Sequence, residues 1–571
     1  MFLPTAKKEV EKLGWDYVDV ILITGDAYID HPAFGIAIIA RILEAHGFRV
    51  AVIPQPNWQD DLRDFKKLGA PRLFFGVSAG AMDSMVNHYT ATKRLRSEDA
   101  YTPGGTIKQR PDYALSVYST ILKQLYPDVP VVIGGIEASL RRFTQYDYWS
   151  DALHKPILID SHADMLVYGM GEKAILQIAQ ELAKGRSIRD IQTIPQTGFV
   201  SETFPQHIAE YTQLSSHDEC VRDKKKFAQN FVRIEHNSNQ WSGVTLIQPV
   251  DSYYVVVNPH YEGAGLEQSE LDDIYNLPFT RKPHPRYRKK KPIPAYEMIK
   301  YSVTIHRGCF GGCSFCTISA HQGKFVASRT HESVVQELQK ISRMPEFDSH
   351  ITDLGGPSAN MYMMRGNTIS MCQACSRASC IFPEKCPNLI DNHIPLVKLY
   401  SAARSVNGIK HVTIGSGIRL DLLQGAKGEH TYMQDLITHH VSGRLKVAPE
   451  HTVSSVLNTM RKPDFNSFLK FKKDFEMYNK RAGKRQQLIP YFISAHPGCT
   501  VHDMKKLSQT FATYKLYAEQ VQDFTPTPMT LSTVMYYTGL NPYTMKPVFV
   551  ARSKREKEAQ KSFFFSRVHT K

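Results

Sequence analysis

The sequence has no long hydrophobic run. No apolar stretch reaches the roughly 18 residues that a membrane-spanning helix needs, so we expect no membrane partner. Residues 1–8 lack the basic, apolar and small-residue regions of a secretory signal, and the chain contains no long internal repeat. These absences predict a cytoplasmic protein built from ordinary folded domains.

Acidic residues are in the minority. The 571 residues contain 70 Lys and Arg against 55 Asp and Glu, a net charge of +15. This balance suits an anionic partner such as RNA, but it also describes an ordinary basic surface. The most basic run, residues 281–291 (RKPHPRYRKKK), is broken by prolines. It is typical of a solvated linker rather than a recognition helix.

Strands and helices alternate over residues 1–196. Candidate strands are residues 18–24, 48–53, 73–77, 129–133 and 165–168, and residues 35–45 follow a helical pattern. Short β-branched runs that alternate with helices are typical of a parallel sheet covered on both faces. We therefore predict an α/β fold that begins with a Rossmann-like domain.

Three regions follow this domain. Residues 197–297 are weakly patterned and end in a Pro/Lys-rich stretch, so we interpret them as a small connecting region and linker. Residues 298–545 alternate again, and we interpret residues 546–571 as a basic C-terminal tail. Candidate strands of the third region are residues 302–306, 350–354, 411–414, 444–447, 488–494 and 521–524. Six strands with helical crossovers predict a partial (β/α)6 barrel, an open relative of the (β/α)8 fold.

Seven of the nine cysteines fall between residues 309 and 386, which indicates metal binding rather than disulfides. Cys309, Cys313 and Cys316 form a C-x3-C-x2-C pattern in residues 307–318 (RGCFGGCSFCTI). Thiolates hold iron–sulfur clusters, and three of them leave one iron of a [4Fe–4S] cube open. The alternative is a zinc site completed by His306 or His321.

The sequence resembles the YgiQ-type family of radical S-adenosylmethionine (SAM) proteins, whose reaction is unassigned. The likeness covers most of the chain and includes the cysteine loop. The other strings that carry it are residues 24–35 (TGDAYIDHPAFG), 75–80 (FGVSAG), 134–142 (GGIEASLRR), 293–299 (IPAYEMI), 353–362 (DLGGPSANMY), 446–451 (KVAPEH) and 491–498 (YFISAHPG).

This resemblance implies an enzyme that cleaves SAM reductively to start radical chemistry on an unknown substrate. The protein would supply orientation and exclude water. A small electron-donor protein of the flavodoxin or ferredoxin class is the expected partner, and no catalytic residue is assigned. The implied SAM contacts are the backbone of Gly355 and Gly356 and the side chains of Ser416, Arg419, Lys446 and Glu450; proline replaces the glutamate of the superfamily's Gly-Gly-Glu element.

A second cysteine group is a candidate metal site. Its four members are Cys372, Cys375, Cys380 and Cys386. Four thiolates could bind an auxiliary Fe–S cluster or a structural zinc ion, and the alternative is that they are paired or free thiols. The sequence leaves these three interpretations open.

Many radical SAM enzymes with this layout carry an N-terminal cobalamin-binding sheet. A histidine-ligated site would show D-x-H-x-x-G after the first strand. Here Asp30 and His31 are adjacent, and Pro32 stands where the histidine should be. We therefore predict that cobalamin is unlikely.

Two other functions compete with the radical SAM hypothesis. One is a non-catalytic Fe–S or zinc protein that senses redox state or binds RNA. The other is a tRNA methyl- or methylthio-transferase, although no appended RNA-binding domain is recognisable.

Overall fold

The fold is that of a computed structural model, which describes residues 1–516 and 519–565. Two compact units divide the chain. Unit 1 contains Met1–Ser238, Ser242–Gly265 and Asp273–Lys300, and unit 2 contains Asn239–Trp241, Leu266–Asp272 and Tyr301–Lys571. None of the described helices is both long and apolar enough to cross a bilayer.

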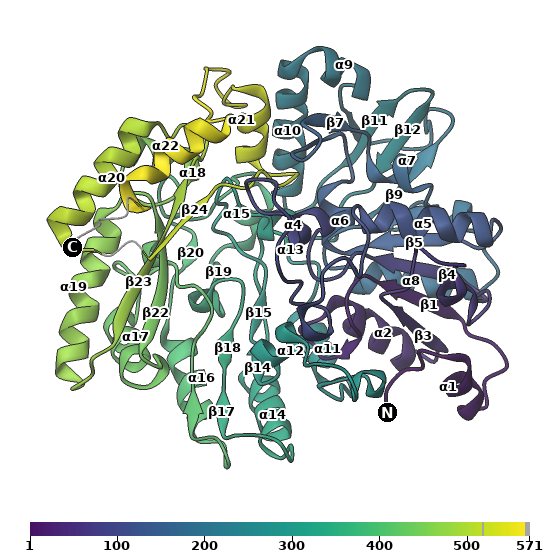
Figure 1. Cartoon of the computed structure of the whole chain (residues 1–571), viewed down its shortest axis with the longest axis horizontal. Helices are drawn as coiled ribbons and strands as arrows, with labels where there is room; N and C mark the ends of the chain where they lie inside the picture. Colours follow the sequence, from purple (N-terminus) through teal and green to yellow (C-terminus); the bar gives the residue numbers. More distant parts are fainter. Residues whose placement is uncertain (517–518, 566–571) are drawn as a thin grey trace. The chain divides into compact units, whose positions relative to one another are not determined.

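Unit 1 is built on a nine-stranded sheet (Figure 1). Its strands are β1 (Val20–Thr24), β3 (Val50–Pro54), β4 (Phe74–Ser78), β5 (Val131–Gly134), β8 (Met165–Val167), β9 (Thr197–Ser201), β10 (Tyr211–Gln213), β11 (Thr245–Val250) and β12 (Tyr253–Val257). The order is β10-β11-β12-β9-β8-β5-β4-β1-β3. Strands β3, β1, β4, β5 and β8 pair in parallel, whereas β9 runs antiparallel to β8.

Helices cover both faces of this sheet, because alternate side chains of its strands point to opposite sides. Leu22 and Val52 pack in one core cluster with the helices α2 and α8, and all five residues of β1 are buried. The helices of unit 1 are α1 (Lys7–Lys12), α2 (Gly35–Ala45), α3 (Arg63–Lys66), α4 (Ser84–His88), α5 (Ala114–Leu125), α6 (Gly135–Leu140), α7 (Ile157–Ser161), α8 (Glu172–Ala183), α9 (His217–Arg222), α10 (Lys224–Ser238) and α12 (Pro294–Ile299). Helix α11 (Gln268–Asn276) crosses the boundary between the units. The predicted α/β class is confirmed.

The connecting region differs from the small excursion expected at residues 197–297. It supplies β9 to β12 of the same sheet. The first part of the Pro/Lys-rich stretch is packed, because β13 (Lys282–Pro283) pairs with β2 (Ile29–Asp30), whereas residues 288–292 are exposed. The hydroxyl of Tyr287, a buried residue, accepts a hydrogen bond from the Tyr28 amide at 3.0 Å. A second small pair, β6 (Gln145–Asp147) and β7 (Ala152–His154), completes the strands of unit 1.

Unit 2 is the predicted open barrel. Parallel ladders join β14 (Ser302–Thr304) to β18 (Asp353–Gly355), β17 (His350–Ile351) to β21 (His411–Val412), and β22 (Arg444–Glu450) to β23 (Gln487–Ser494) and β24 (Gln520–Asp523). Antiparallel pairs β15 (His306–Arg307) with β16 (Ala327–Ser328) and β19 (Arg365–Gly366) with β20 (Leu389–Ile390) lie in its loops.

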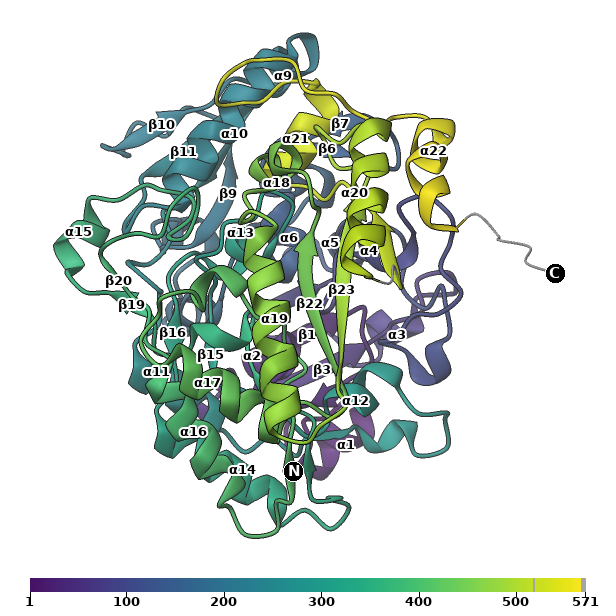
Figure 2. The same ribbon diagram turned by 90° about the vertical axis from the view of Figure 1, so that its left-hand side faces the viewer.

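Helices of unit 2 lie beside these strands (Figures 1 and 2). One large apolar core joins the strands to these helices. The helices of unit 2 are α13 (Ile318–Gln322), α14 (His331–Ser342), α15 (Ile369–Gln373), α16 (Ile394–Arg404), α17 (Glu429–Asp435), α18 (Ser454–Met460), α19 (Asn466–Arg481), α20 (Val501–Tyr514), α21 (Leu531–Thr538) and α22 (Lys554–Phe565). The tail predicted at residues 546–571 is packed where it is described, since Gln560 on α22 is fully buried. Residues 566–571 of that tail lie outside the described part.

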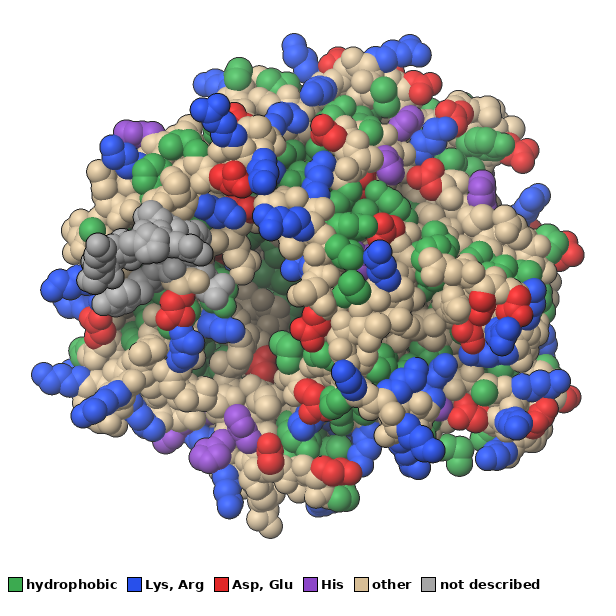
Figure 3. Space-filling model, viewed as in Figure 1, with side chains coloured by type: hydrophobic (Ala, Val, Ile, Leu, Met, Phe, Trp, Pro, Cys, Tyr) green, Lys and Arg blue, Asp and Glu red, His purple; other side chains and the backbone are tan. Residues whose placement is uncertain are grey.

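Basic side chains are spread over the face shown in Figure 3, with acidic side chains among them. The exposed members of the 281–291 run are Arg286, Arg288, Lys289, Lys290 and Lys291.

Candidate functional site

The cysteine loop follows β15 at the carboxyl end of the first barrel strand, where barrel active sites are built. Cys309, Cys313 and Cys316 are each partly buried. Burial, with a smaller contribution from the neighbouring Cys313, raises the pKa of Cys316 to about 12. Across residues 1–516 and 519–565, no three His, Cys, Asp or Glu side chains converge closely enough to hold a single metal ion. The three thiols share one short loop, in which Cys313 and Cys309 both act on the pKa of Cys316.

Arg419 is aimed at this loop. Its Nη1 donates to Cys313 Sγ at 2.9 Å, and its other two nitrogens bind the Asp421 carboxylate at 3.0 and 2.5 Å. The side chain is buried, with 9% of its surface exposed. A buried guanidinium next to thiols stabilises the thiolate form, which is the form that binds iron. Sequence reasoning assigned Arg419 to SAM, whereas here it contacts a cysteine.

The glycine pair predicted to contact SAM lies against two polar side chains. A Cβ atom at Gly355 would lie 2.5 Å from Ser416 Oγ, and one at Gly356 would lie 2.6 Å from the His306 ring, so both positions require glycine. Asp353 fixes Ser416 by accepting from its hydroxyl at 2.5 Å and from its amide at 3.2 Å. The predicted residues Gly355 and Ser416 are thus brought together.

His306 is a residue that sequence reasoning considered only as a zinc ligand. It is fully buried, and neither ring nitrogen has a hydrogen-bond partner within the described chain. Burial lowers its pKa to about 3, so the ring is neutral. Buried polar atoms without partners are costly. The ring lies against Gly356 and two residues before the cysteine loop, and its two nitrogens are the polar atoms there that lack a partner among the described residues.

Glu450 and Lys446 differ in their surroundings. Glu450 ends β22 with a left-handed φ of +67°, is buried, and lies 3.7 Å from Lys462 Nζ. Burial raises the pKa of its carboxyl, and the Lys462 and Arg419 cations oppose that rise. Lys446 is exposed on the same strand. The structure therefore brings Glu450 towards Arg419 but leaves Lys446 outside this buried group.

Two serine hydroxyls and one imidazole connect the cysteine loop to the last part of the chain. Ser532 Oγ donates to Ser314 Oγ at 2.8 Å and lies 2.7 Å from His496 Nε2. The Ser532 amide also donates to the Ser314 carbonyl at 2.9 Å. Ser532 is on α21, and Ser314 follows Cys313 directly. No local pattern in the sequence signals this contact.

The second cysteine group lies on α15 and in the loop after it. All four thiols are partly buried. This loop contacts the first one, since the Cys380 amide donates to the Phe310 carbonyl at 3.0 Å and Ser379 Oγ donates to the Gly311 carbonyl at 2.9 Å. The two cysteine groups are therefore neighbours in unit 2, although they are more than fifty residues apart in the sequence.

In unit 1, the polar residues of the motifs face inward. Asp30 and Arg41 form an ion pair with 0% and 1% of their side chains exposed. Arg141 binds Asp83 at 2.8 Å in the same buried manner. Such paired charges hold loops at the edge of the sheet. His31 is also buried, so its ring does not reach the surface.

A pocket of about 430 Å³ opens beside the carboxyl ends of β1 and β4. Its lining is mainly apolar and includes Phe34, Tyr101 and Ile299. Asn87 also lines it, and its buried Nδ2 has no partner among the described residues. Open α/β sheets bind ligands at this edge. Neither Asp30 nor His31 lines the pocket.

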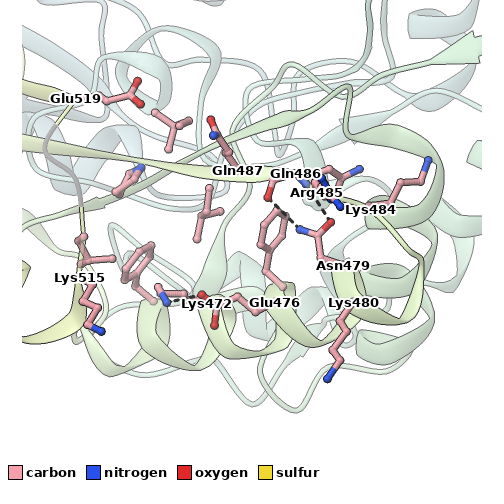
Figure 4. A pocket seen from close by; sticks show the side chains of 16 residues that line it. Lys472, Glu476, Asn479, Lys480, Lys484, Arg485, Gln486, Gln487, Lys515 and Glu519 are labelled. Atoms are coloured by element: carbon pink, nitrogen blue, oxygen red, sulfur yellow. Dashed lines mark hydrogen bonds and ion pairs between the residues drawn. The ribbon is translucent and has the colours of Figure 1, made fainter.

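A larger pocket in unit 2, of about 560 Å³, lies between α19 and the amino end of β23 (Figure 4). Lys472 pairs with Glu476 along its rim, and Asn479 Nδ2 donates to the Gln486 carbonyl at 3.3 Å. Because barrel sites form at the carboxyl ends of strands, this pocket is not part of the cysteine site.

Two family models match this chain. Residues 2–302 match the model described as radical SAM N-terminal. Residues 519–569 match a domain of unknown function, which contains Ser532. Among solved structures, the radical SAM methyltransferase TsrM from Kitasatospora setae, with cobalamin and a [4Fe–4S] cluster bound, is similar with a TM-score of 0.50 and 14% identity. That match covers 90% of this chain and 74% of the other.

The prediction that cobalamin is unlikely is wrong. It rested on the missing D-x-H-x-x-G pattern, but the TsrM structure holds cobalamin in a fold like this one. That pattern reports only one mode of binding, in which a histidine ligates the cobalt. Its absence therefore does not argue against the cofactor.

Relatives from other organisms are similar to this chain over nearly its whole length. A UPF0313 protein of Bacteroides thetaiotaomicron is 56% identical, over 99% of this chain and 94% of its own length. The UPF0313 protein YgiQ of Escherichia coli is 42% identical, over 98% and 83% respectively. These matches confirm the YgiQ-type resemblance, and the chain belongs to the UPF0313 family of radical SAM proteins.

Proposed function

We propose that this protein is an enzyme that binds a [4Fe–4S] cluster through Cys309, Cys313 and Cys316 and cleaves SAM reductively to begin radical chemistry. The observation that carries the proposal is the loop itself: three neighbouring thiols, a buried guanidinium on Cys313 Sγ, and the orphaned His306 ring beside Gly356. When bound, such a cluster supplies one-electron reduction of SAM at its open iron.

The residues of this chain would prepare the site for that chemistry. Arg419, held by Asp421, supplies positive charge next to the thiolates. We propose that the backbone of Gly355 and Gly356 contacts the amino group of SAM and that Ser416 and Glu450 contact its other polar parts. Lys446, exposed on β22, is the remaining predicted contact. A small flavodoxin- or ferredoxin-class protein is the proposed electron donor.

The test is formation of 5′-deoxyadenosine. Protein reconstituted anaerobically with iron and sulfide and reduced with dithionite is expected to convert SAM into methionine and 5′-deoxyadenosine. Omission of the reductant should stop the reaction. A protein that carries a reducible cluster but leaves SAM intact would contradict the proposal.

Arg419→Met is expected to weaken cluster binding by about tenfold to a hundredfold, because it removes the charge-assisted hydrogen bond to Cys313 Sγ, a bond of a kind that contributes about 1.5–3 kcal/mol. The iron that the reconstituted protein retains at increasing chelator concentration measures this affinity. Arg404→Met, which removes an arginine paired with Asp435 elsewhere in unit 2, is the matched control. Equal affinities in the two variants would remove Arg419 from the site.

Ser532→Ala is expected to loosen the cysteine loop, because it deletes the hydroxyl that joins Ser314 to His496. A lost hydrogen bond of roughly 1 kcal/mol corresponds to about fivefold faster cluster loss. The decay of the cluster's visible absorbance in a chelator reports the rate. Ser562→Ala, at an exposed position on α22, should decay as the unaltered protein does.

The pocket beside β1 and β4 is proposed to hold the ligand of unit 1, and cobalamin is the first ligand to test. Its apolar lining suits the broad face of a corrin ring, and the Asn87 amide offers a donor. Titration with hydroxocobalamin is expected to give a saturable change in the visible spectrum that Asn87→Leu weakens. An unchanged spectrum at saturating ligand would eliminate cobalamin.

A further inference from the structure

The second cysteine loop, residues 367–388, is closed at its base by a pair of strands. Strands β19 and β20 pair across its base, with Gly366 opposite Leu389. Inside it, the Cys375 amide donates to the Cys372 carbonyl at 3.1 Å, and the Cys386 amide donates to the Cys380 carbonyl at 2.8 Å. These bonds hold the four cysteines in two linked turns.

Two nitrogen donors point at the sulfur atoms of these turns. Asn388 Nδ2 donates to Cys372 Sγ at 3.4 Å, and the Arg377 amide donates to Cys375 Sγ at the same distance. A Cβ at Gly366 would lie 2.2 Å from Cys372 Sγ, so this sulfur is fitted tightly against the strand. Hydrogen bonds to sulfur are characteristic of cluster-bound thiolates and tune their potential.

A buried lysine supplies charge to the same loop. Lys324 is 2% exposed, and its Nζ donates to the Arg377 carbonyl at 2.9 Å. Within the described residues it forms no ion pair with a carboxylate. A buried cation without a counter-charge is strongly unfavourable. The thiols of this loop are the candidates for the negative charge, because Lys324 contacts the carbonyl of Arg377 and the amide of Arg377 donates to Cys375 Sγ.

Backbone hydrogen bonds draw the four cysteines into one short segment, because one closes the turn from Cys372 to Cys375 and another joins Cys386 to Cys380. Four thiolates suit an iron–sulfur cluster or a tetrahedral zinc ion. The N–H groups that donate to Cys372 Sγ and Cys375 Sγ favour the cluster, because hydrogen bonds to the sulfur ligands set its reduction potential.

We propose that Cys372, Cys375, Cys380 and Cys386 bind an auxiliary iron–sulfur cluster as thiolates, with Lys324 as the buried counter-charge. The site is built directly on the first cysteine loop. A Cβ at Gly312 would lie 2.3 Å from the Ala378 carbonyl oxygen, so the two loops touch through backbone at a position where only glycine fits. This proposal does not depend on whether the protein cleaves SAM.

Counting metal in anaerobically purified protein tests the proposal. The unaltered chain is expected to hold about eight irons and about eight sulfides if both sites carry four-iron cubes. The variant with Cys309, Cys313 and Cys316 all replaced by alanine should retain about half of that iron, no zinc, and an electron paramagnetic resonance signal on reduction. Further replacement of Cys380 and Cys386 by serine should remove the rest.

Two results would overturn the second cluster. One is an alanine variant without iron, and the other is an alanine variant with one zinc per chain. The count in the unaltered protein decides the matter if that variant does not fold, because iron for only one cube contradicts the proposal. Conversely, loss of SAM cleavage with the second cluster intact would count against the proposed function alone.

Lys324→Met gives an independent readout. It should lower the iron content of the second site several-fold and shift the potential of the remaining cluster, whereas Lys473→Met, at an exposed position on α19, should change neither. Unaltered iron content and potential in Lys324→Met would contradict the role given to this lysine.

Discussion

Alanine at Cys309, Cys313 or Cys316 is expected to reduce 5′-deoxyadenosine formation to background in every case. Each substitution removes one of only three protein ligands of the proposed cluster, so the remaining two cannot hold the open iron in position for SAM. Product is measured by chromatography after anaerobic reduction with dithionite, with iron determined on the same samples.

The matched control is Cys220→Ala. This cysteine is also buried, but it lies in unit 1, where its Sγ accepts a hydrogen bond from Asn230. It should retain full activity and iron, which separates loss of a ligand from loss of any thiol. Activity that survives in Cys309→Ala would refute the assignment of the loop.

Asp30→Ala is expected to destabilise unit 1 by about 3–5 kcal/mol, because removing one partner of a buried ion pair leaves the other charge without compensation. Asp30 accepts from Arg41 at 3.0 and 2.5 Å and from the Thr280 amide at 2.9 Å. Denaturant unfolding followed by tryptophan fluorescence reports on this unit, since Trp15, Trp58 and Trp149 all belong to it.

Two companion variants sharpen the test. Glu44→Ala removes the other carboxylate on Arg41, but Glu44 is 37% exposed, so its effect should stay below about 1 kcal/mol. The double variant Asp30→Leu with Arg41→Met should recover much of the lost stability, because apolar side chains can replace a buried pair. A loss below 1 kcal/mol in Asp30→Ala would mean that the pair contributes little.

Much of the fold could be predicted because its signals are local. Residues 35–45 coincide with α2, and the predicted strand at residues 488–494 lies within β23. Strands β9 and β10 were missed, since TGFVS and YTQ are short and barely apolar. The stretch around Pro283 was predicted to be solvated because it is rich in lysine, arginine and proline. The burial of Tyr287 within it depends on a contact with Tyr28, which is distant in the sequence.

In the candidate site, too, local patterns could be predicted and contacts between distant residues could not. Spacing within the chain identified Cys309, Cys313 and Cys316, although their role as ligands stays a prediction. Contacts between residues distant in the sequence could not be predicted. Arg419 and Cys313 are 106 residues apart, and the sequence around Lys324 gives no sign that this lysine is buried. The assignment of Gly355 and Glu450 to SAM also stays a prediction.

The contact between Ser314 and Ser532 has a consequence for biosynthesis. The ribosome makes Ser314 first, and the hydroxyl that secures it follows 218 residues later. A nascent chain therefore lacks this anchor of the cysteine loop until the ribosome has passed α21. Earlier contacts, such as that of the Ser314 amide with the Met460 carbonyl, can form before it.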